Sequence, residues 1–214
     1  MRRQASFLKG YVRVGTIPIL GRLGLVPCIA QFHRIYPGIH VEIKEGKTLE
    51  LMDRLHSSDM DVAFVVPSKE IHEKTIVFHP VIEDELVLVV DELHPLAKKS
   101  LINLSDAAHE KFIFADSSSS MNRMAMDACL DAGFTPNVIY ECGQADMILG
   151  LVGERLGVTI MARKVAAASA IPHTICLPLK TRIQRITALA VPNQFPLSQP
   201  VKLFVRHVLQ GGMG

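Results

Sequence analysis

The sequence has no long apolar run and no marked excess of charge, and each absence excludes a class of protein. Its longest aliphatic run, residues 86–90, is far shorter than the ~20 residues that cross a bilayer. The mean hydropathy of +0.26 therefore indicates a globular core. Lys and Arg number 23 against 21 Asp and Glu, a balance that argues against a chain that grips nucleic acid by charge alone.

The cysteines are few and scattered. Cys28, Cys129, Cys142 and Cys176 stand singly and form no C-x-x-C pair. This spacing is typical of reduced thiols that fill a core. The N-terminus has two arginines but no apolar stretch long enough for a signal peptide. These features predict a cytoplasmic location.

Motifs for catalysis, metal binding and cofactor binding are also absent. Gly46-Lys47-Thr48 looks like the end of a phosphate-binding loop, but that motif needs a glycine where Val41 stands inside a predicted strand. The chain has no G-x-S-x-G, H-E-x-x-H or G-x-G-x-x-G motif. We therefore expect no catalytic residue, no metal and no cofactor.

Apolar residues repeat with a period of two in some segments and of about 3.6 in others, which predicts alternating strands and helices. The first third of the chain follows the order strand, helix, strand, helix, strand, and a second series begins at Lys111. Expected strands are residues 11–14, 39–44, 61–66, 76–82, 85–90, 111–115, 137–141, 158–161 and 187–191. Expected helices are residues 25–36, 48–55, 121–132, 144–156, 164–170 and a last one from 198 on. The pattern predicts an α/β fold.

Two series of similar order predict two lobes joined by a double crossover. We expect the chain to leave the first lobe at Val89 and Val90 and to return at Ala190 and Val191, which makes these residues the hinge. The first lobe then comprises residues 10–89 and 191–210, the second residues 90–190, and residues 1–9 and 211–214 are tails. Two connections permit closure while keeping the lobes together, with a ligand cleft expected between them.

Hydroxyl-bearing loops follow three predicted strands, at the ends where ligands sit in open α/β sheets. They contain residues 16–19, Thr48 and residues 117–120. Thr48 is expected to cap a helix, so that its hydroxyl and the free backbone N–H groups could hold an anion. An ordinary helix cap and a solvated serine turn would explain the same residues. Cys142, after another strand, is open to a structural, a ligand-lining or a nucleophilic interpretation.

Several short motifs occur in a fixed order along the chain. Residues 10–15 resemble a G-x-L-x-I-G strand, residues 25–37 an L-L-P…F…Y/H-P helix, and residues 41–55 a V-x-L…G-x-S/T…L segment. Residues 151–158 follow an L-V-A-x-G-x-G-I turn. Together, over residues 10–210, they resemble the effector-binding domain of the LysR-type transcriptional regulators.

The resemblance implies a fold like that of type 2 periplasmic binding proteins, with two Rossmann-like lobes, and a small organic effector that we expect to be anionic. By position, the expected effector-binding residues are Thr16, Ile17, Pro18, Ile19, Lys47, Thr48, Val66, Ser117, Ser118, Cys142, Met161 and Ala162. It also implies that DNA is bound only by an N-terminal winged helix-turn-helix outside this chain, of whose linker helix residues 1–8 are at most the last turns.

Homodimers or homotetramers are a further implication of the resemblance. In that family, effector domains commonly pair antiparallel, one first-lobe helix against the partner's second-lobe helix. The expected interface residues are Leu25, Ile29 and Phe32 on the first helix and Met121, Met124 and Ala128 on the second.

Two positions depart from the family pattern. Ala162 stands where the family usually has a proline near the end of a strand, so the family pattern does not predict the conformation of the loop that follows. Arg155-Leu156-Gly157 replaces the more usual glycine pair and is expected to alter the adjoining turn.

Two other functions use the same architecture. A solute-binding protein of a transport system predicts a signal peptide or a lipoprotein cysteine, and none begins this chain. An enzyme on this fold would use Cys142 as a nucleophile, which fast alkylation by iodoacetamide would reveal. We expect a sensor domain without enzymatic activity.

Overall fold

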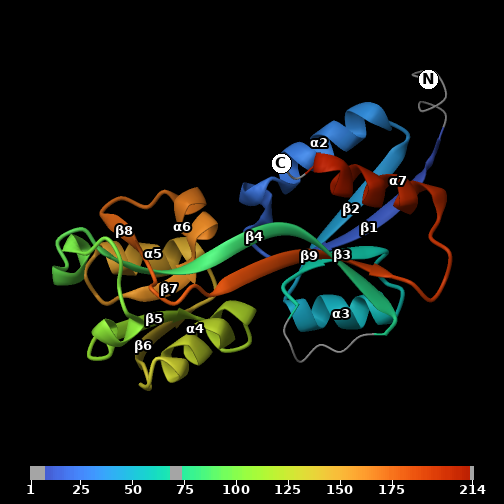
Figure 1. Cartoon of the computed structure of the whole chain (residues 1–214). Helices are drawn as coiled ribbons and strands as arrows, with labels where there is room; N and C mark the ends of the chain where they lie inside the picture. The colour runs from blue at the N-terminus through green and yellow to red at the C-terminus, as the bar shows by residue number, and fades with distance from the viewer. Residues whose placement is uncertain (1–7, 68–73, 213–214) are drawn as a thin grey trace. The chain divides into compact units, whose positions relative to one another are not determined.

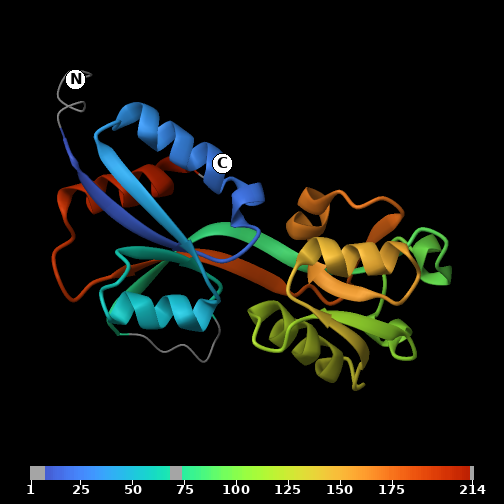
Figure 2. The same cartoon turned by 180° about the vertical axis from the view of Figure 1, so that it is seen from behind.

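The computed structural model describes residues 8–67 and 74–212 of the chain. They form two compact units. The first combines the described residues up to Glu83 with those from Ile186 onward, and the second is Asp84–Arg185. Each unit is built from strands with helices packed on them (Figure 1, Figure 2). The α/β class that the sequence predicts is confirmed.

Parallel strands form the sheet of the first unit. β1 (Gly10–Thr16) lies between β2 (Ile39–Glu45) and β3 (Val62–Val65), and it runs parallel to both. On the other side of β3, β9 (Gln184–Pro192) pairs antiparallel, so the sheet is mixed. Val12 and Val14 of β1 are buried and Tyr11 is exposed, which agrees with the alternation from which this strand is predicted, and the strand ends in the buried Gly15 and Thr16.

Helices cover both faces of this sheet. α2 (Leu25–Ile35) and α3 (Thr48–His56) connect the parallel strands, which confirms the predicted order of the first third. α2 and the C-terminal helix α7 (Gln199–His207) lie on one side of the sheet and α3 on the other (Figure 1, Figure 2). Phe32 of α2 and Phe204 of α7 are fully buried and meet edge to face, with ring centroids 5.2 Å apart.

Two short turns of helix complete the first unit, η1 (Leu20–Leu23) and η4 (Val208–Gly212). Gly211 belongs to η4, so the predicted tail of residues 211–214 begins too early. Residues 1–7, 213 and 214, which the sequence assigns to tails, lie outside the described residues. Along the described part of the chain, no helix combines the length and apolar character needed to span a membrane.

The second unit contains two sets of paired strands. β5 (Lys111–Ala115) and β6 (Asn137–Cys142) are parallel. β7 (Thr159–Ala162) and β8 (Thr174–Pro178) both pair antiparallel with β4 (Ile76–Asp91). A parallel bridge between Phe112 and Val158 joins the two sets.

The helices of the second unit lie on both sides of β5 and β6, with α4 on one side and α5 on the other (Figure 1, Figure 2). Its helical elements are η2 (Pro95–Lys98), η3 (Leu104–Ala107), α4 (Ser120–Asp131), α5 (Ala145–Gly153) and α6 (Arg163–Ser169).

The chain passes between the units within β4 and β9, at Glu83/Asp84 and at Arg185/Ile186. The sequence places the passage a few residues later on each strand. Val89 is in register with Thr159 and Cys176 inside the second unit, and Ala190 is in register with Ala63 inside the first.

The lobe boundaries and the hinge are therefore corrected. The predicted hinge residues Val89, Val90, Ala190 and Val191 are all buried, and three of them pair with neighbouring strands of one unit. Their apolar side chains fill sheet interiors, and this burial is what produces the hydrophobic runs in the sequence. The passage itself falls at charged residues, Asp84 and Arg185.

Three predicted elements differ from those observed. The strands expected at residues 76–82 and 85–90 form one strand, β4. β8 was not predicted. The helix expected at residues 144–156 ends at Gly153, where the N–H of Glu154 donates to the carbonyl oxygens of Gly150 and Val152. Arg155 then takes a left-handed conformation with φ 63°, which ends the helix before Gly157.

Half of the predicted dimer contacts lie in the chain's own core. Leu25, Phe32 and Ala128 are buried, so these three residues are wrongly assigned to an interface. Ile29, Met121 and Met124 are half-buried. Apolar residues at helical spacing usually form the face of a helix that packs on the chain's own core, rather than a face that contacts a partner. The buried residues of α2 follow this rule.

We expect the substitution Phe32→Ala to lower the free energy of unfolding by about 3–5 kcal/mol, because it removes a fully buried ring from the α2–α7 contact. Urea denaturation measures the loss. The control is Val26→Ala on the same helix, which is 64% exposed and should change the free energy by about 0.5 kcal/mol or less. Unchanged stability together with weaker self-association would instead place Phe32 in an interface.

Candidate functional site

The carboxyl ends of β1, β2 and β3 form one cluster of candidate residues in the first unit. Parallel strands end at the same edge of a sheet, so the loops after Thr16, Glu45 and Val65 start close together. The N–H of Gly46 donates to the carbonyl oxygen of Thr16 at 3.0 Å, which joins two of these loops directly. We call this group, residues 16–19, 47, 48 and 66, the first cluster.

Thr48 links the first cluster to α3 in a way that the sequence did not predict. It is the first residue of α3, and the capping position belongs to Lys47. The expected capping role of Thr48 is therefore wrong. Its buried hydroxyl instead accepts a hydrogen bond from the N–H of Val66 at 3.3 Å, which ties the start of α3 to the end of β3.

The loop after β1 has a tightly constrained backbone. The Thr16 hydroxyl donates to the carbonyl oxygen of Ile17 at 3.1 Å, and both residues are buried. Ile19 has φ 76°, an unfavourable conformation for a β-branched residue. Its carbonyl oxygen accepts from the N–H of Arg22 at 2.9 Å, which begins η1. Pro18 and Lys47 are the exposed members of the first cluster.

A second cluster lies at the carboxyl ends of β5, β6 and β7. Ala115 and Cys142 are in register at the ends of β5 and β6, and the N–H of Asp116 donates to the carbonyl oxygen of Cys142 at 3.1 Å. The Phe112–Val158 bridge sets the segment entering β7 parallel to β5, so Met161 and Ala162 come at the same edge. We define the second cluster as residues 117, 118, 142, 161 and 162.

Asp116 organises the serine loop of the second cluster. Its Oδ1 accepts from the N–H of Ser118 at 3.2 Å and also from the Ser118 hydroxyl. Ser119 caps α4 by accepting from the N–H of Met121 at 3.0 Å. Asp116 was missed as a site residue, although an Asp two residues before a serine is a recognisable turn signal.

Exposure differs among the members of the second cluster. Ser117 and Ser118 are exposed and Cys142 is partly exposed. Met161 and Ala162 are buried in β7, so their side chains contribute to the packing of this edge.

The cysteines carry no sign of an activated thiol. Burial raises the pKa of Cys28 to about 11 and that of Cys129 to about 12, and it also raises the pKa of Cys176. Within the described residues, the Cys142 thiol has no hydrogen-bond partner that could act as its base. No set of three or more His, Cys, Asp or Glu in this part of the chain could hold a metal ion.

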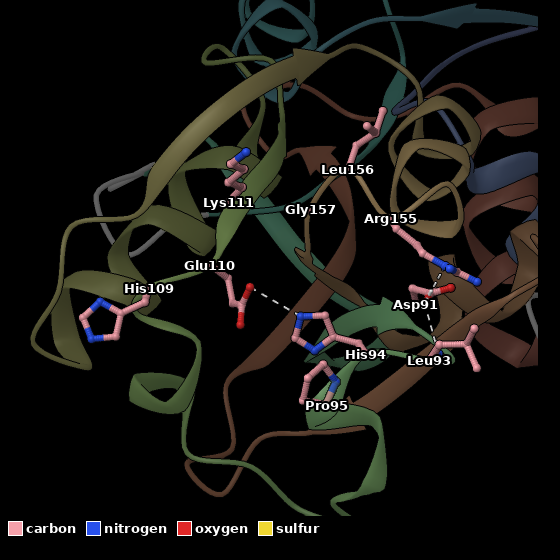
Figure 3. A pocket seen from close by; sticks show the side chains of 10 residues that line it. All are labelled: Asp91, Leu93, His94, Pro95, His109, Glu110, Lys111, Arg155, Leu156 and Gly157. Atoms are coloured by element: carbon pink, nitrogen blue, oxygen red, sulfur yellow. Dashed lines mark hydrogen bonds and ion pairs between the residues drawn. The ribbon is translucent and has the colours of Figure 1, made fainter.

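A cavity of about 420 Å³ lies in the second unit, at the edge of the sheet opposite the second cluster (Figure 3). It is formed where β4 ends, where β5 begins and where α5 leads into β7. None of the predicted site residues lines it. Its lining residues are Asp91, Leu93, His94, Pro95, His109, Glu110, Lys111, Arg155, Leu156 and Gly157.

The sequence of the chain matches a known family. The model of the LysR substrate binding domain covers residues 5–212, and the chain belongs to that family. The transcriptional dual regulator GltC of Bacillus subtilis is 26% identical over 94% of this chain and 67% of that protein. The regulator YybE of the same species is 30% identical over 72% of this chain and 52% of that protein. The chain thus spans about half to two thirds of these relatives.

Solved structures agree with this assignment. The effector-binding domain of QuiR in complex with shikimate has a TM-score of 0.85 at 25% identity, covering 96% of this chain and 98% of that one. The C-terminal domain of a LysR family regulator from Rhodococcus sp. RHA1 has a TM-score of 0.83 at 24% identity, covering 94% and 99%. The two-lobed fold predicted from the sequence is confirmed.

We expect iodoacetamide at pH 8 to label Cys142 first and Cys28 and Cys129 last, because the latter are fully buried and their raised pKa values keep them protonated. Peptide mass spectrometry over a time course measures the order. The same reaction in denaturant, where all four thiols should react alike, is the control. Native Cys28 or Cys129 reacting at the denatured rate would contradict the burial described here.

Proposed function

We propose that this chain is the effector-sensing part of a longer LysR-type transcriptional regulator that binds a small organic anion, and that the residues of the first and second clusters are its candidate contacts. The main observation in support of the proposal is that the two clusters are built in the same way. In each, parallel strands end together beside the start of a helix, α3 in one unit and α4 in the other.

The chemistry of both clusters suits an anion. The first turn of a helix leaves backbone N–H groups without partners inside the helix and carries a partial positive charge. Lys47 adds a full charge at the start of α3, and the exposed Ser117 adds a hydroxyl before α4, next to Ser118, whose hydroxyl donates to Asp116. Shikimate, bound by QuiR, and benzoate, the effector of BenM, are both small carboxylates, which supports the same ligand class here.

Effector binding would couple to the conformation of the chain through the segments that connect the units. β4 and β9 are the two segments that run from one unit to the other. An effector that prefers one arrangement of the units shifts the population toward it by its difference in affinity. In the full regulator, this shift would reposition N-terminal DNA-binding domains and so alter transcription.

The remaining functional assignments are part of the same proposal. We place the regulator in the cytoplasm as a homodimer or homotetramer, with the half-buried Ile29, Met121 and Met124 as the retained interface residues. We assign the chain no enzymatic activity. The curated relatives are transcriptional regulators, which favours sensing over solute transport.

We expect a thermal-shift screen of small carboxylates, including shikimate and benzoate, to raise the melting temperature, because a ligand that binds the folded state stabilises it. The double variant Thr48→Ala/Ser118→Ala should lose this shift. Loss of the Thr48 hydroxyl also leaves the Val66 N–H unpaired, so each shift is measured from the variant's own melting temperature.

The matched control replaces exposed hydroxyls outside both clusters, Ser105→Ala/Thr181→Ala, and should retain the full shift. Thr48→Ser, which keeps the hydroxyl, should retain most of it. An undiminished shift in Thr48→Ala/Ser118→Ala would refute the proposed site.

A further inference from the structure

The cavity of the second unit has the size and chemistry of a separate ligand site. Its volume of about 420 Å³ lies within the range of ~300–1,000 Å³ typical of small-molecule pockets. Its walls come from three segments: residues 91–95 at the end of β4, residues 109–111 at the start of β5, and residues 155–157 after α5 (Figure 3).

Asp91 is the buried charge of this cavity. Its side chain is only 4% exposed. Oδ1 accepts a hydrogen bond from the N–H of Leu93 at 3.0 Å and lies 3.3 Å from Nε of Arg155. Oδ2 is buried and, among the described residues, has no hydrogen-bond partner. A buried carboxylate oxygen without a donor is unfavourable, so Asp91 calls for a donor group from a ligand.

Arg155 occupies a position that favours glycine. Its φ of 63° is left-handed, and a side chain there strains the backbone. This residue nevertheless lines the cavity and contacts Asp91. Nε of Arg155 makes this contact, and the two Nη groups take no part in it. The Arg155 side chain is 64% exposed. The strain thus places a guanidinium beside a buried carboxylate.

The segment that carries Arg155 packs tightly on the start of β5. A Cβ at Gly157 would lie 2.5 Å from the carbonyl oxygen of Lys111. That carbonyl accepts from the N–H of Val158 at 2.8 Å. Lys111 and the Arg155 segment are thereby held together at the cavity. Among the described residues, the Lys111 amino group has no partner.

The other polar lining groups are His94 and Glu110, which lie close to each other. Nε2 of His94 lies 3.4 Å from Oε2 of Glu110, and Nδ1 of His94 accepts from the N–H of Leu96 at 3.2 Å. Nε2 therefore carries the hydrogen that points to Glu110. The cavity thus offers acids, Asp91 and Glu110, and bases, Lys111 and Arg155, beside apolar Leu93 and Leu156.

We propose that this cavity binds a small zwitterion of the α-amino acid class. Its ammonium group would donate to Oδ2 of Asp91, and its carboxylate would accept from Nη of the adjacent Arg155 (Figure 3). Its side chain would lie on the apolar wall. A simple anion leaves Asp91 without a donor and a simple amine leaves the Nη groups of Arg155 unused, so both charges are required together.

The test uses the 214-residue chain and isothermal titration calorimetry with each of the twenty L-amino acids. At least one should bind with a Kd below about 1 mM. For the tightest, the analogue without the amino group and the analogue without the carboxylate should each bind at least tenfold more weakly. No binding by any amino acid, or equal binding of either analogue, overturns the proposal.

Two variants locate the binding. Arg155→Gly removes the guanidinium and relieves the left-handed strain, and Asp91→Asn keeps the shape of the side chain while removing its charge. Each should weaken binding at least tenfold, whereas Arg182→Gly, an exposed arginine paired with Glu85 outside the cavity, should change it less than twofold. Unchanged binding in both Arg155→Gly and Asp91→Asn would overturn the assignment.

This site is independent of the proposed effector site. Thr48→Ala/Ser118→Ala should leave amino acid binding unchanged even if it abolishes the response to carboxylates. Loss of amino acid binding in that variant would instead assign the amino acid to the strand-end clusters and overturn the second site.

Discussion

Because β1 pairs in parallel with both β2 and β3, three loops leave the sheet at one edge, and the candidate site depends on this pairing. A slip of one residue would turn Val12 and Val14 out of the core, so burial fixes the register and with it the position of the loops. The pairing of β5 with β6 does the same in the second unit. The core thus determines where ligand-binding groups can be placed.

The opposite edge of the second unit has a different chemistry. At the carboxyl ends of the strands, the serine loop and the start of α4 carry hydroxyls and backbone N–H groups beside the partly exposed Asp116. At the other edge, Asp91 is buried and Arg155 is held beside it in a left-handed conformation. The two sites proposed in this unit therefore have distinct charge requirements.

Periodicity predicted the strands and helices of the first third because each has one buried face. It failed in β4 because Asp84 interrupts the apolar pattern. The buried Asp84 carboxylate accepts from the N–H of Lys164 at 3.0 and 3.2 Å, so the charge is satisfied at the start of α6 and the strand continues. β8 was missed because its five residues pair only with the distant β4.

Position at strand ends predicts which residues lie at these sheet edges, but their hydrogen-bond partners depend on tertiary contacts that local sequence does not contain. Thr48 was mistaken for a cap because its contact with Val66 spans two elements.

The most direct test of the central claim is amide hydrogen exchange with and without the carboxylate that most stabilises the chain. We predict slower exchange in residues 16–19, 46–48, 66, 117–118 and 142–143. Unchanged exchange in these residues, or protection centred on Asp91 and Arg155, would contradict binding at the clusters.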